Sequence, residues 1–171
     1  MHYMQTTPPT TDGSDQISMV VFSDDLDKIL AAMIIANGAA AFDMKVNLFF
    51  TFWAISALRA PAKKGKGKKF IEKAFGFMLP KGFDKLALSK MQMGGMGAAM
   101  IKNIMKKQHV ASLPEMFATA GELGVQINVC EMSMKLMGIQ KEELIDYPNM
   151  QICGVATFLS DAQDSKIQLF I

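Results

Sequence analysis

Two cysteines are the most reactive candidates in this chain. Cys130 ends the apolar alternating run that begins at Val125, and a helix-like segment opens directly after it. A thiolate is the nucleophilic form of cysteine, and a helix N-terminus stabilises that form and so lowers the pKa of the thiol. Glu131 acts in the opposite sense, because a carboxylate beside the sulfur disfavours the anion. The sequence therefore indicates a candidate reactive thiol at Cys130 and leaves the balance of these two effects open.

Cys153 holds the same kind of position, between a short apolar run that starts at Met150 and a helix-like segment that starts at Gly154. In an open parallel sheet the carboxyl ends of the strands open onto one edge, and sites form in the crevice there. Neighbouring strands lie about 4.8 Å apart, so the two sulfurs can approach each other although they are distant in sequence. For either thiol alone the competing interpretation is a packed core residue, because free cysteine is among the most buried residue types.

The elements that must position these thiols alternate along the chain. Compact apolar runs of strand length are followed by segments whose apolar residues recur at helical spacing. Strands that are apolar throughout favour a parallel sheet covered on both faces. We therefore expect an α/β fold, a flavodoxin-like, doubly wound, mainly parallel sheet of about five strands with helices on both faces. The expected strands are 17–22, 45–50, 125–129, 150–153 and 167–171, and the expected helices are 26–41, 51–58, 113–123, 133–137 and 154–161.

The domain organisation follows from changes in composition. Residues 1–15 are polar and contain paired prolines, so we expect a disordered tail, followed by a single domain over 16–171. A Lys/Met-rich insertion at about 60–108 is much longer than the usual βα connection, and such insertions tend to be functional. Its lysine run at 60–69 is expected to be a solvated loop, with an anion or membrane-surface contact as the alternative. Residues 70–79 are predicted to form an amphipathic helix, and 86–88 a short strand or an extended connector.

The insertion ends in a methionine-rich block that runs from Met91 to Met105. Its glycines do not form a G-x-G-x-x-G fingerprint after a clear strand, so the block is a weak candidate for nucleotide binding. Core packing is the first interpretation of its methionines, and an adaptable contact surface near the thiol is the alternative, suited to a protein partner, a self-interface or a lipid surface. The apolar stripe expected on a helix here consists of Met96, Met100, Ile101, Ile104 and Met105.

Composition narrows the classes of function. Half of the residues (50%) are hydrophobic and 20% are charged, which is typical of a globular chain, and the net charge of +2 gives no indication of nucleic-acid binding. The 2 cysteines fit a reducing cytoplasm better than a disulfide scaffold. We expect no cofactor and no metal, because there is no C-x-x-C and the histidines are only His2 and His109. Flavin or nucleotide binding in the crevice is a third, weaker option. We see no signal peptide, and no apolar run is long enough for a spanning helix.

Three segments together resemble a known family. They are MGGMG at Met93 to Gly97, CEMSMKLMG at Cys130 to Gly138, and GVATFL at Gly154 to Leu159. The combination resembles the DsrE/DsrF/DsrH-like superfamily, and more closely its larger DsrE-type branch, over about residues 17–171. The resemblance implies a flavodoxin-like fold, a homo-oligomer, and a cysteine, here Cys130, that carries sulfane sulfur as a persulfide. It also implies partners of the rhodanese-like and TusA-like kinds. Cys153 has no counterpart in the core motif of the smaller members.

These observations lead to the hypothesis of a cytoplasmic sulfur carrier, a sulfurtransferase-like persulfide relay. Cys130 is expected to accept and pass on sulfur, and Cys153 to resolve the persulfide or share the load. The alternative is a non-catalytic oligomeric module that docks on a membrane surface or a partner protein through the methionine-rich insertion. The residues expected to line the site are Glu131, Met132, Ser133, Met93, Gly94, Gly95, Met96 and Gly154.

Overall fold

The fold is built on a sheet of five parallel strands. The computed structural model describes residues 15–63, 65, 67, 76 and 78–171, and the expected tail lies outside these residues except for Asp15. The strands lie in the order β4-β3-β2-β1-β5, and every pairing is parallel. Their bounds are β1 Gln16–Val21, β2 Lys45–Phe50, β3 Gln126–Cys130, β4 Met150–Cys153 and β5 Ile167–Phe170. Each lies within a residue or so of its predicted range.

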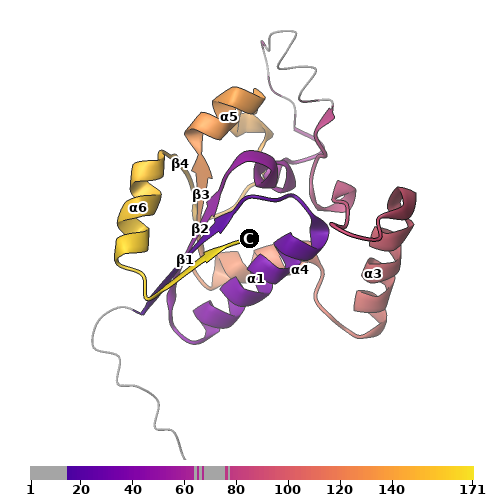
Figure 1. Ribbon diagram of the computed structural model, residues 1–171, viewed down its shortest axis with the longest axis horizontal. Helices are drawn as coiled ribbons and strands as arrows, with labels where there is room; N and C mark the ends of the chain where they lie inside the picture. The colour runs from indigo at the N-terminus through magenta and orange to yellow at the C-terminus, as the bar shows by residue number, and fades with distance from the viewer. Residues whose placement is uncertain (1–14, 64, 66, 68–75, 77) are drawn as a thin grey trace, which may run out of the picture.

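Helices cover both faces of this sheet, as the sequence predicts. The helices α1 (Leu26–Ala41) and α4 (Leu113–Glu122) lie on one face, and α6 (Val155–Gln163) lies on the other (Figure 1). The short helix α5 (Glu131–Met137) follows β3 at the carboxyl edge. The segment predicted as a helix after β2 is a 3₁₀ helix, η1 (Phe52–Leu58). The remaining described helices are η2 (Phe83–Lys85), η3 (Met93–Gly95), α3 (Met96–Lys107) and η4 (Lys141–Glu143). The expected doubly wound α/β architecture is confirmed.

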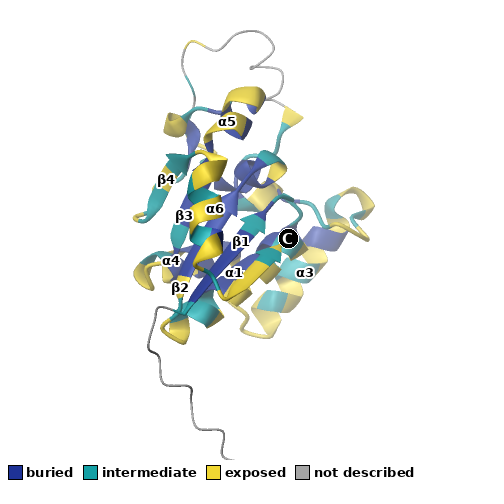
Figure 2. Cartoon of the chain, turned by 60° about the vertical axis from the view of Figure 1, so that its left-hand side comes forward, coloured by how far each residue is buried: buried dark blue, intermediate teal, exposed yellow. Residues whose placement is uncertain are grey.

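The two faces of the sheet differ in chemistry, and the expectation that the strands are apolar throughout is wrong. Side chains alternate between faces along a strand, so one face collects apolar residues and the other collects polar ones. The apolar face, under α1 and α4, contains Ile17, Met19, Val21, Val46, Leu48, Phe50, Ile127 and Val129, all buried. The opposite face contains Gln16, Ser18, Asn47, Asn128 and Gln151. Of these, Gln16, Ser18, Asn47 and Asn128 are buried, and α6 lies in front of the strands in the view of Figure 2.

Helix α6 supplies hydrogen-bond partners for this polar face. The side-chain amide of Gln16 donates to the backbone carbonyl of Asp161 at 2.6 Å, and the amide of Asn128 donates to the Asp161 carboxylate at 3.2 Å. Ser165, just after the helix, donates to the hydroxyl of Ser18 at 2.8 Å. Buried polar groups are tolerated when they are paired in this way. The polar layer therefore fixes how α6 lies across the sheet.

A buried arginine of the body, Arg59, attaches the insertion. Arg59, at the end of η1, lies 3.2 Å from the carboxylate of Glu143, and the two side chains are only 1% and 2% exposed. The Arg59 guanidinium also donates to the backbone carbonyls of Gly76 at 3.1 Å and Leu79 at 3.4 Å. The helix predicted over 70–79 falls mostly outside the described residues. The described residues Gly76 and Leu79 within this range accept the hydrogen bonds from Arg59.

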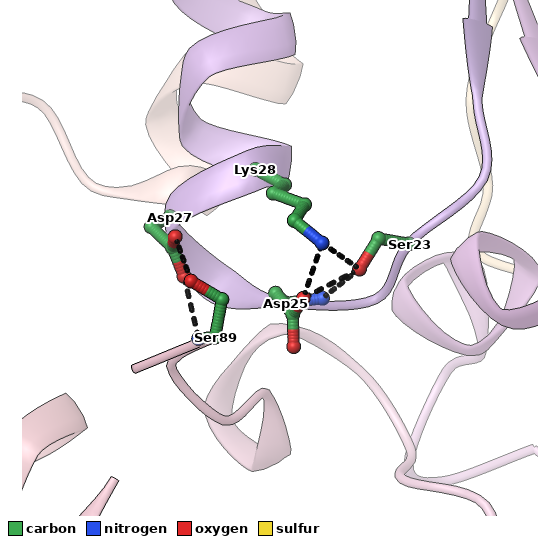
Figure 3. A network of polar contacts seen from close by, with 5 residues as sticks. All are labelled: Ser23, Asp25, Asp27, Lys28 and Ser89. Atoms are coloured by element: carbon green, nitrogen blue, oxygen red, sulfur yellow. Dashed lines mark hydrogen bonds and ion pairs between the residues drawn. The ribbon is translucent and has the colours of Figure 1, made fainter. Parts of the chain in front are cut away.

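A second anchor joins the insertion to α1. Ser89 donates to the Asp27 carboxylate from its backbone amide at 2.9 Å and from its hydroxyl at 2.6 Å (Figure 3). Beside it, Lys28 pairs with Asp25 at 2.9 Å, and Ser23 donates to the same carboxylate at 2.7 Å. Leu86 to Leu88 is an extended connector rather than a strand, and its Ala87 carbonyl accepts a hydrogen bond from the first amide of α1 at 2.6 Å.

The methionine stripe predicted for α3 splits into two faces. Ile101 and Met105 are half-buried, whereas Met96, Met100 and Ile104 are 66%, 51% and 46% exposed. Core packing is therefore wrong for the three outer residues. The five positions span about half of the helix circumference, which is more than a helix packed on one side can bury. In Figure 1 the helix lies to one side of the sheet layers, which leaves its outer face open.

Candidate functional site

The Cys130 sulfur lies at the end of β3 among hydrogen-bond donors. Cys130 is buried, with 4% of its surface exposed, and it is the residue that precedes α5. Burial alone would raise the pKa of this thiol. Hydrogen bonds from the Ser133 hydroxyl and amide, the Thr51 hydroxyl and the Met132 amide outweigh that effect and lower the pKa below its ordinary value. The environment therefore favours the nucleophilic thiolate.

The neighbouring carboxylate does not oppose this preference strongly. Glu131 is exposed, and its carboxylate pairs with Lys135 one helical turn along α5 at 2.7 Å. This ion pair neutralises the charge that the sequence placed beside the thiol. The balance that the sequence left open is thus decided in favour of a lowered pKa for Cys130.

The second thiol lies opposite the first. Cys130 and Cys153 are direct partners in the parallel register of β3 and β4, so the prediction that they share one edge is confirmed. Both are free. Burial, followed by the charges of Asp161 and of Cys130, raises the pKa of the Cys153 thiol, although a hydrogen bond with Thr157 acts against the rise. The two sulfurs therefore differ in character, with the thiolate favoured at Cys130 and the thiol at Cys153.

A third residue extends the pair into a row across three strand ends. Phe50 is the register partner of Val129, so Thr51, the next residue, follows β2 where Cys130 ends β3. The hydroxyls of Thr51 and Ser133 lie 2.9 Å apart and share one hydrogen bond, so one of their two protons remains to be donated to the Cys130 sulfur, which both hydroxyls lie beside. Sequence reasoning missed Thr51. A hydroxyl directly after a predicted neighbouring strand is the signal that could have pointed to it.

The other residues expected to line the site fall into two groups. Met132 is exposed on the first turn of α5, Ser133 is fully buried, and Gly154 is the residue that precedes α6. The structure does not bring Met93, Gly94, Gly95 and Met96 to the thiols. They lie in η3 and at the start of α3, which both views place well away from α5 (Figures 1 and 2). The anchor between Ser89 and Asp27 holds this segment beside α1 instead.

Comparison with known proteins identifies relatives of this chain. The model of the DsrE/DsrF/DrsH-like family matches residues 13–170, nearly the whole chain. The chain belongs to this family. It is 48% identical over 165 residues to the uncharacterized protein YrkE of Bacillus subtilis, covering 94% of this chain and 99% of that protein. It is 32% identical over 160 residues to the sulfur carrier protein DsrE2 of Allochromatium vinosum, covering 91% of this chain and 98% of that protein.

Two further features of this DsrE-like chain bear on its surroundings. Within the described ranges, no helix has both the length and the apolar character needed to cross a membrane. A surface hollow of about 780 Å³ lies between α1, α3 and α4, on the opposite side of the sheet from α6. Apolar side chains such as Leu26 and Met105 line it together with Lys102, Lys106 and His109. Neither cysteine lines this hollow, so the thiol chemistry belongs to the strand ends alone.

Proposed function

We propose that this chain is a sulfur carrier that holds sulfane sulfur as a persulfide on Cys130. The Cys130 thiolate attacks the outer sulfur of a donor persulfide or polysulfide. The S–S bond of the donor breaks, the donor leaves as a thiolate, and Cys130 becomes Cys–S–SH. In the forward step a partner thiolate attacks the outer sulfur and Cys130 leaves as the thiolate.

The observation that carries the proposal is the set of donors around the Cys130 sulfur. Thiol exchange needs a thiolate both to attack and to leave, and a lowered pKa favours both states. Thr51, Ser133 and the Met132 amide supply that stabilisation at a single atom. Two free cysteines are compatible with the reducing cytoplasm that we propose as its compartment.

Exposed apolar side chains around the strand ends suit a protein partner. Met132 and Leu136 project from α5, and Val155 and Leu159 from α6, and all four are exposed. Exposed methionines form adaptable contact surfaces. We propose that a rhodanese-like or TusA-like protein presents its own cysteine here. The name of the Allochromatium vinosum relative, a sulfur carrier protein, supports the same general role.

Polysulfide loading followed by intact mass measurement tests the proposal. The wild type is expected to gain the mass of one or more sulfur atoms, and the gain should disappear after treatment with a reducing thiol. Cys130→Ser should gain none, while Cys153→Ser serves as the matched control and should still load. Equal loading of wild type and Cys130→Ser would end the proposal.

A second candidate function follows from the outer face of α3. Met96, Met100 and Ile104 recur at the spacing of one helical turn, and all three are exposed. Lys106 and Lys107 follow at the end of the helix. An apolar face flanked by lysines is suited to the surface of an anionic membrane. The insertion would then hold the protein at the membrane surface, whether or not Cys130 carries sulfur.

Flotation with lipid vesicles tests this second candidate. The wild type is expected to float with vesicles that contain phosphatidylglycerol and to stay behind with neutral ones. The triple variant Met96→Ser, Met100→Ser, Ile104→Ser should lose flotation, whereas Met132→Ser with Leu136→Ser on α5 should keep it. If the wild type does not float, the face docks on a protein or has no docking role.

A further inference from the structure

The faces of the strands show where the two thiols point. Two residues before the cysteines, Asn128 and Gln151 are also register partners, and the Gln151 amide donates to the Asn128 side-chain oxygen at 2.8 Å. These two side chains therefore lie on one face of the sheet, the face that α6 covers. Side chains alternate along a strand with a period of two, so Cys130 and Cys153 lie on that same face.

The spacing of the pair matches that of a disulfide. Neighbouring strands lie about 4.8 Å apart, and the Cα atoms of natural disulfides lie roughly 4.4 to 6.8 Å apart. Direct register partners on one face meet this condition without separation of the strands. Cys153 is also less buried than Cys130, and Gly154 after it carries no side chain beside the sulfur.

We propose that Cys153 discharges the Cys130 persulfide by closing a Cys130–Cys153 disulfide and releasing the carried sulfur as sulfide. This inference rests on the proposed persulfide at Cys130. It adds a second fate for the sulfur. Transfer to a partner keeps the sulfur at the sulfane level, whereas discharge through Cys153 reduces it.

The step balances without an external oxidant. The Cys153 thiol loses its proton to solvent, and its sulfur attacks the inner sulfur, Sγ of Cys130. The bond between that atom and the outer sulfur breaks, and the outer sulfur leaves as HS⁻ with the hydrogen that it already carries. The sulfur of Cys153 is oxidised from thiol to disulfide, and the outer sulfur is reduced to sulfide. An external dithiol then reduces the disulfide and restores both cysteines.

The contrast between the thiols makes discharge the slower of the two fates. A partner thiolate attacks the outer sulfur, and Cys130 is then the leaving group, favoured by its hydrogen-bond donors. Cys153 must first lose a proton, which its burial and the charge of Asp161 disfavour. A loaded carrier would therefore deliver its sulfur when a partner is present and release sulfide when none arrives.

The test follows the release of sulfide over time from loaded wild type and a loaded variant. Wild type and Cys153→Ser are loaded with polysulfide, freed of excess reagent, and sampled for released sulfide and for intact mass after thiol alkylation. The wild type is expected to release sulfide and to end as a species that resists alkylation, with the two cysteine peptides linked. Release is expressed per persulfide loaded on each protein, and Cys153→Ser should release sulfide about tenfold more slowly or less, with no linked peptides.

The outcomes separate this inference from the carrier proposal. If Cys153→Ser releases sulfide as fast as the wild type, or if no linked peptides form, discharge through Cys153 is overturned and the carrier stands. If the wild type does not load, both fail. Treatment of the unloaded protein with diamide tests the pairing directly: formation of the Cys130–Cys153 disulfide supports the inference, and its absence overturns it. Cys153→Ala repeats each arm to separate the loss of the thiol from the effect of a new hydroxyl.

Discussion

At the scale of single residues, the reactivity of Cys130 depends on two hydroxyls from different elements. Thr51 follows β2 and Ser133 lies in α5, yet both reach the same sulfur and each other. A hydrogen bond to a charged group contributes about 1.5–3 kcal/mol, and one pKa unit corresponds to about 1.4 kcal/mol. Because the two hydroxyls share one hydrogen bond, they supply one proton to the thiolate at a time, and the Ser133 and Met132 amides are the other donors that lower the pKa of Cys130.

Removal of either hydroxyl should raise the pKa of Cys130. In Ser133→Ala or Thr51→Val the rate of alkylation is expected to reach half its maximum about one pH unit higher than in the wild type. The sign follows from the lowered pKa in the intact protein, because losing a donor to the thiolate leaves less of it at neutral pH. Ser56→Ala is the matched control, a fully buried serine that is not among the donors to the sulfur. An unchanged pH profile in both site variants would contradict this account.

Residue types indicated part of this site before the fold was known. The shared edge of Cys130 and Cys153 follows from two apolar runs that each end in cysteine, because the carboxyl ends of parallel strands open onto one edge. Their direct pairing depends on the strand order, which only the structure shows. Thr51 could not be found in this way without knowing which strand is the neighbour of β3. The placement of the methionine block also required tertiary contacts, since its anchor is a hydrogen bond between Ser89 and Asp27, far apart in sequence.

At the scale of elements, all five strands and most helices were predictable from the spacing of apolar residues and from the capping and turn residues between them. The capping box at Ser112 and Glu115 and the glycine after α5 mark boundaries that local chemistry determines. The split of the α3 stripe was not predictable, because an isolated helix does not show which half of its apolar surface meets the body. Nor was the buried polar layer expected, since its polar residues stand among apolar ones and depend on α6 for partners.

The buried Arg59–Glu143 ion pair should contribute strongly to the free energy of unfolding. Removing one partner of a buried ion pair typically costs about 3–5 kcal/mol. Arg59→Met is therefore expected to lower the free energy of unfolding by roughly that amount, measured by urea denaturation. Lys63→Ala removes an exposed ion pair with Asp146 from the same region and should change stability little. Similar losses in both variants would show that burial does not set the contribution.

At the scale of the whole molecule, the edge of the sheet formed by β5 carries exposed apolar side chains. The edge strand β5 exposes Phe170 and Ile167, and the ring of Phe170 lies 5.8 Å from that of Phe22. Exposed edge strands with apolar side chains are surfaces that proteins usually cover. The homo-oligomer implied by the family resemblance stays a prediction, and this edge is where we expect copies of the chain to meet.

A charge on that edge should weaken the assembly. Phe170→Glu is expected to shift the mass measured by light scattering toward that of a monomer, because a carboxylate would have to be buried unpaired at the interface. Phe42→Glu provides the control, since Phe42 is 83% exposed against 71% for Phe170 but follows α1 rather than belonging to the β5 edge. A wild type that is already monomeric, or a Phe170→Glu variant of unchanged mass, would exclude this edge as the interface.

The alignment of β4 with β3 makes the distance between the two cysteines along the chain unimportant. The Ile127 amide bonds to the Asn149 carbonyl at 2.8 Å, and the Asn128–Gln151 pair holds the strand two residues below the thiols. Residues can be added to the loop before Asn149 without moving Cys153. A slip of β4 by one residue would instead turn Cys153 to the opposite face and place Ile152 or Gly154 beside Cys130. The Asn128–Gln151 pair, rather than the number of residues between the two cysteines, therefore determines which residue of β4 lies beside Cys130.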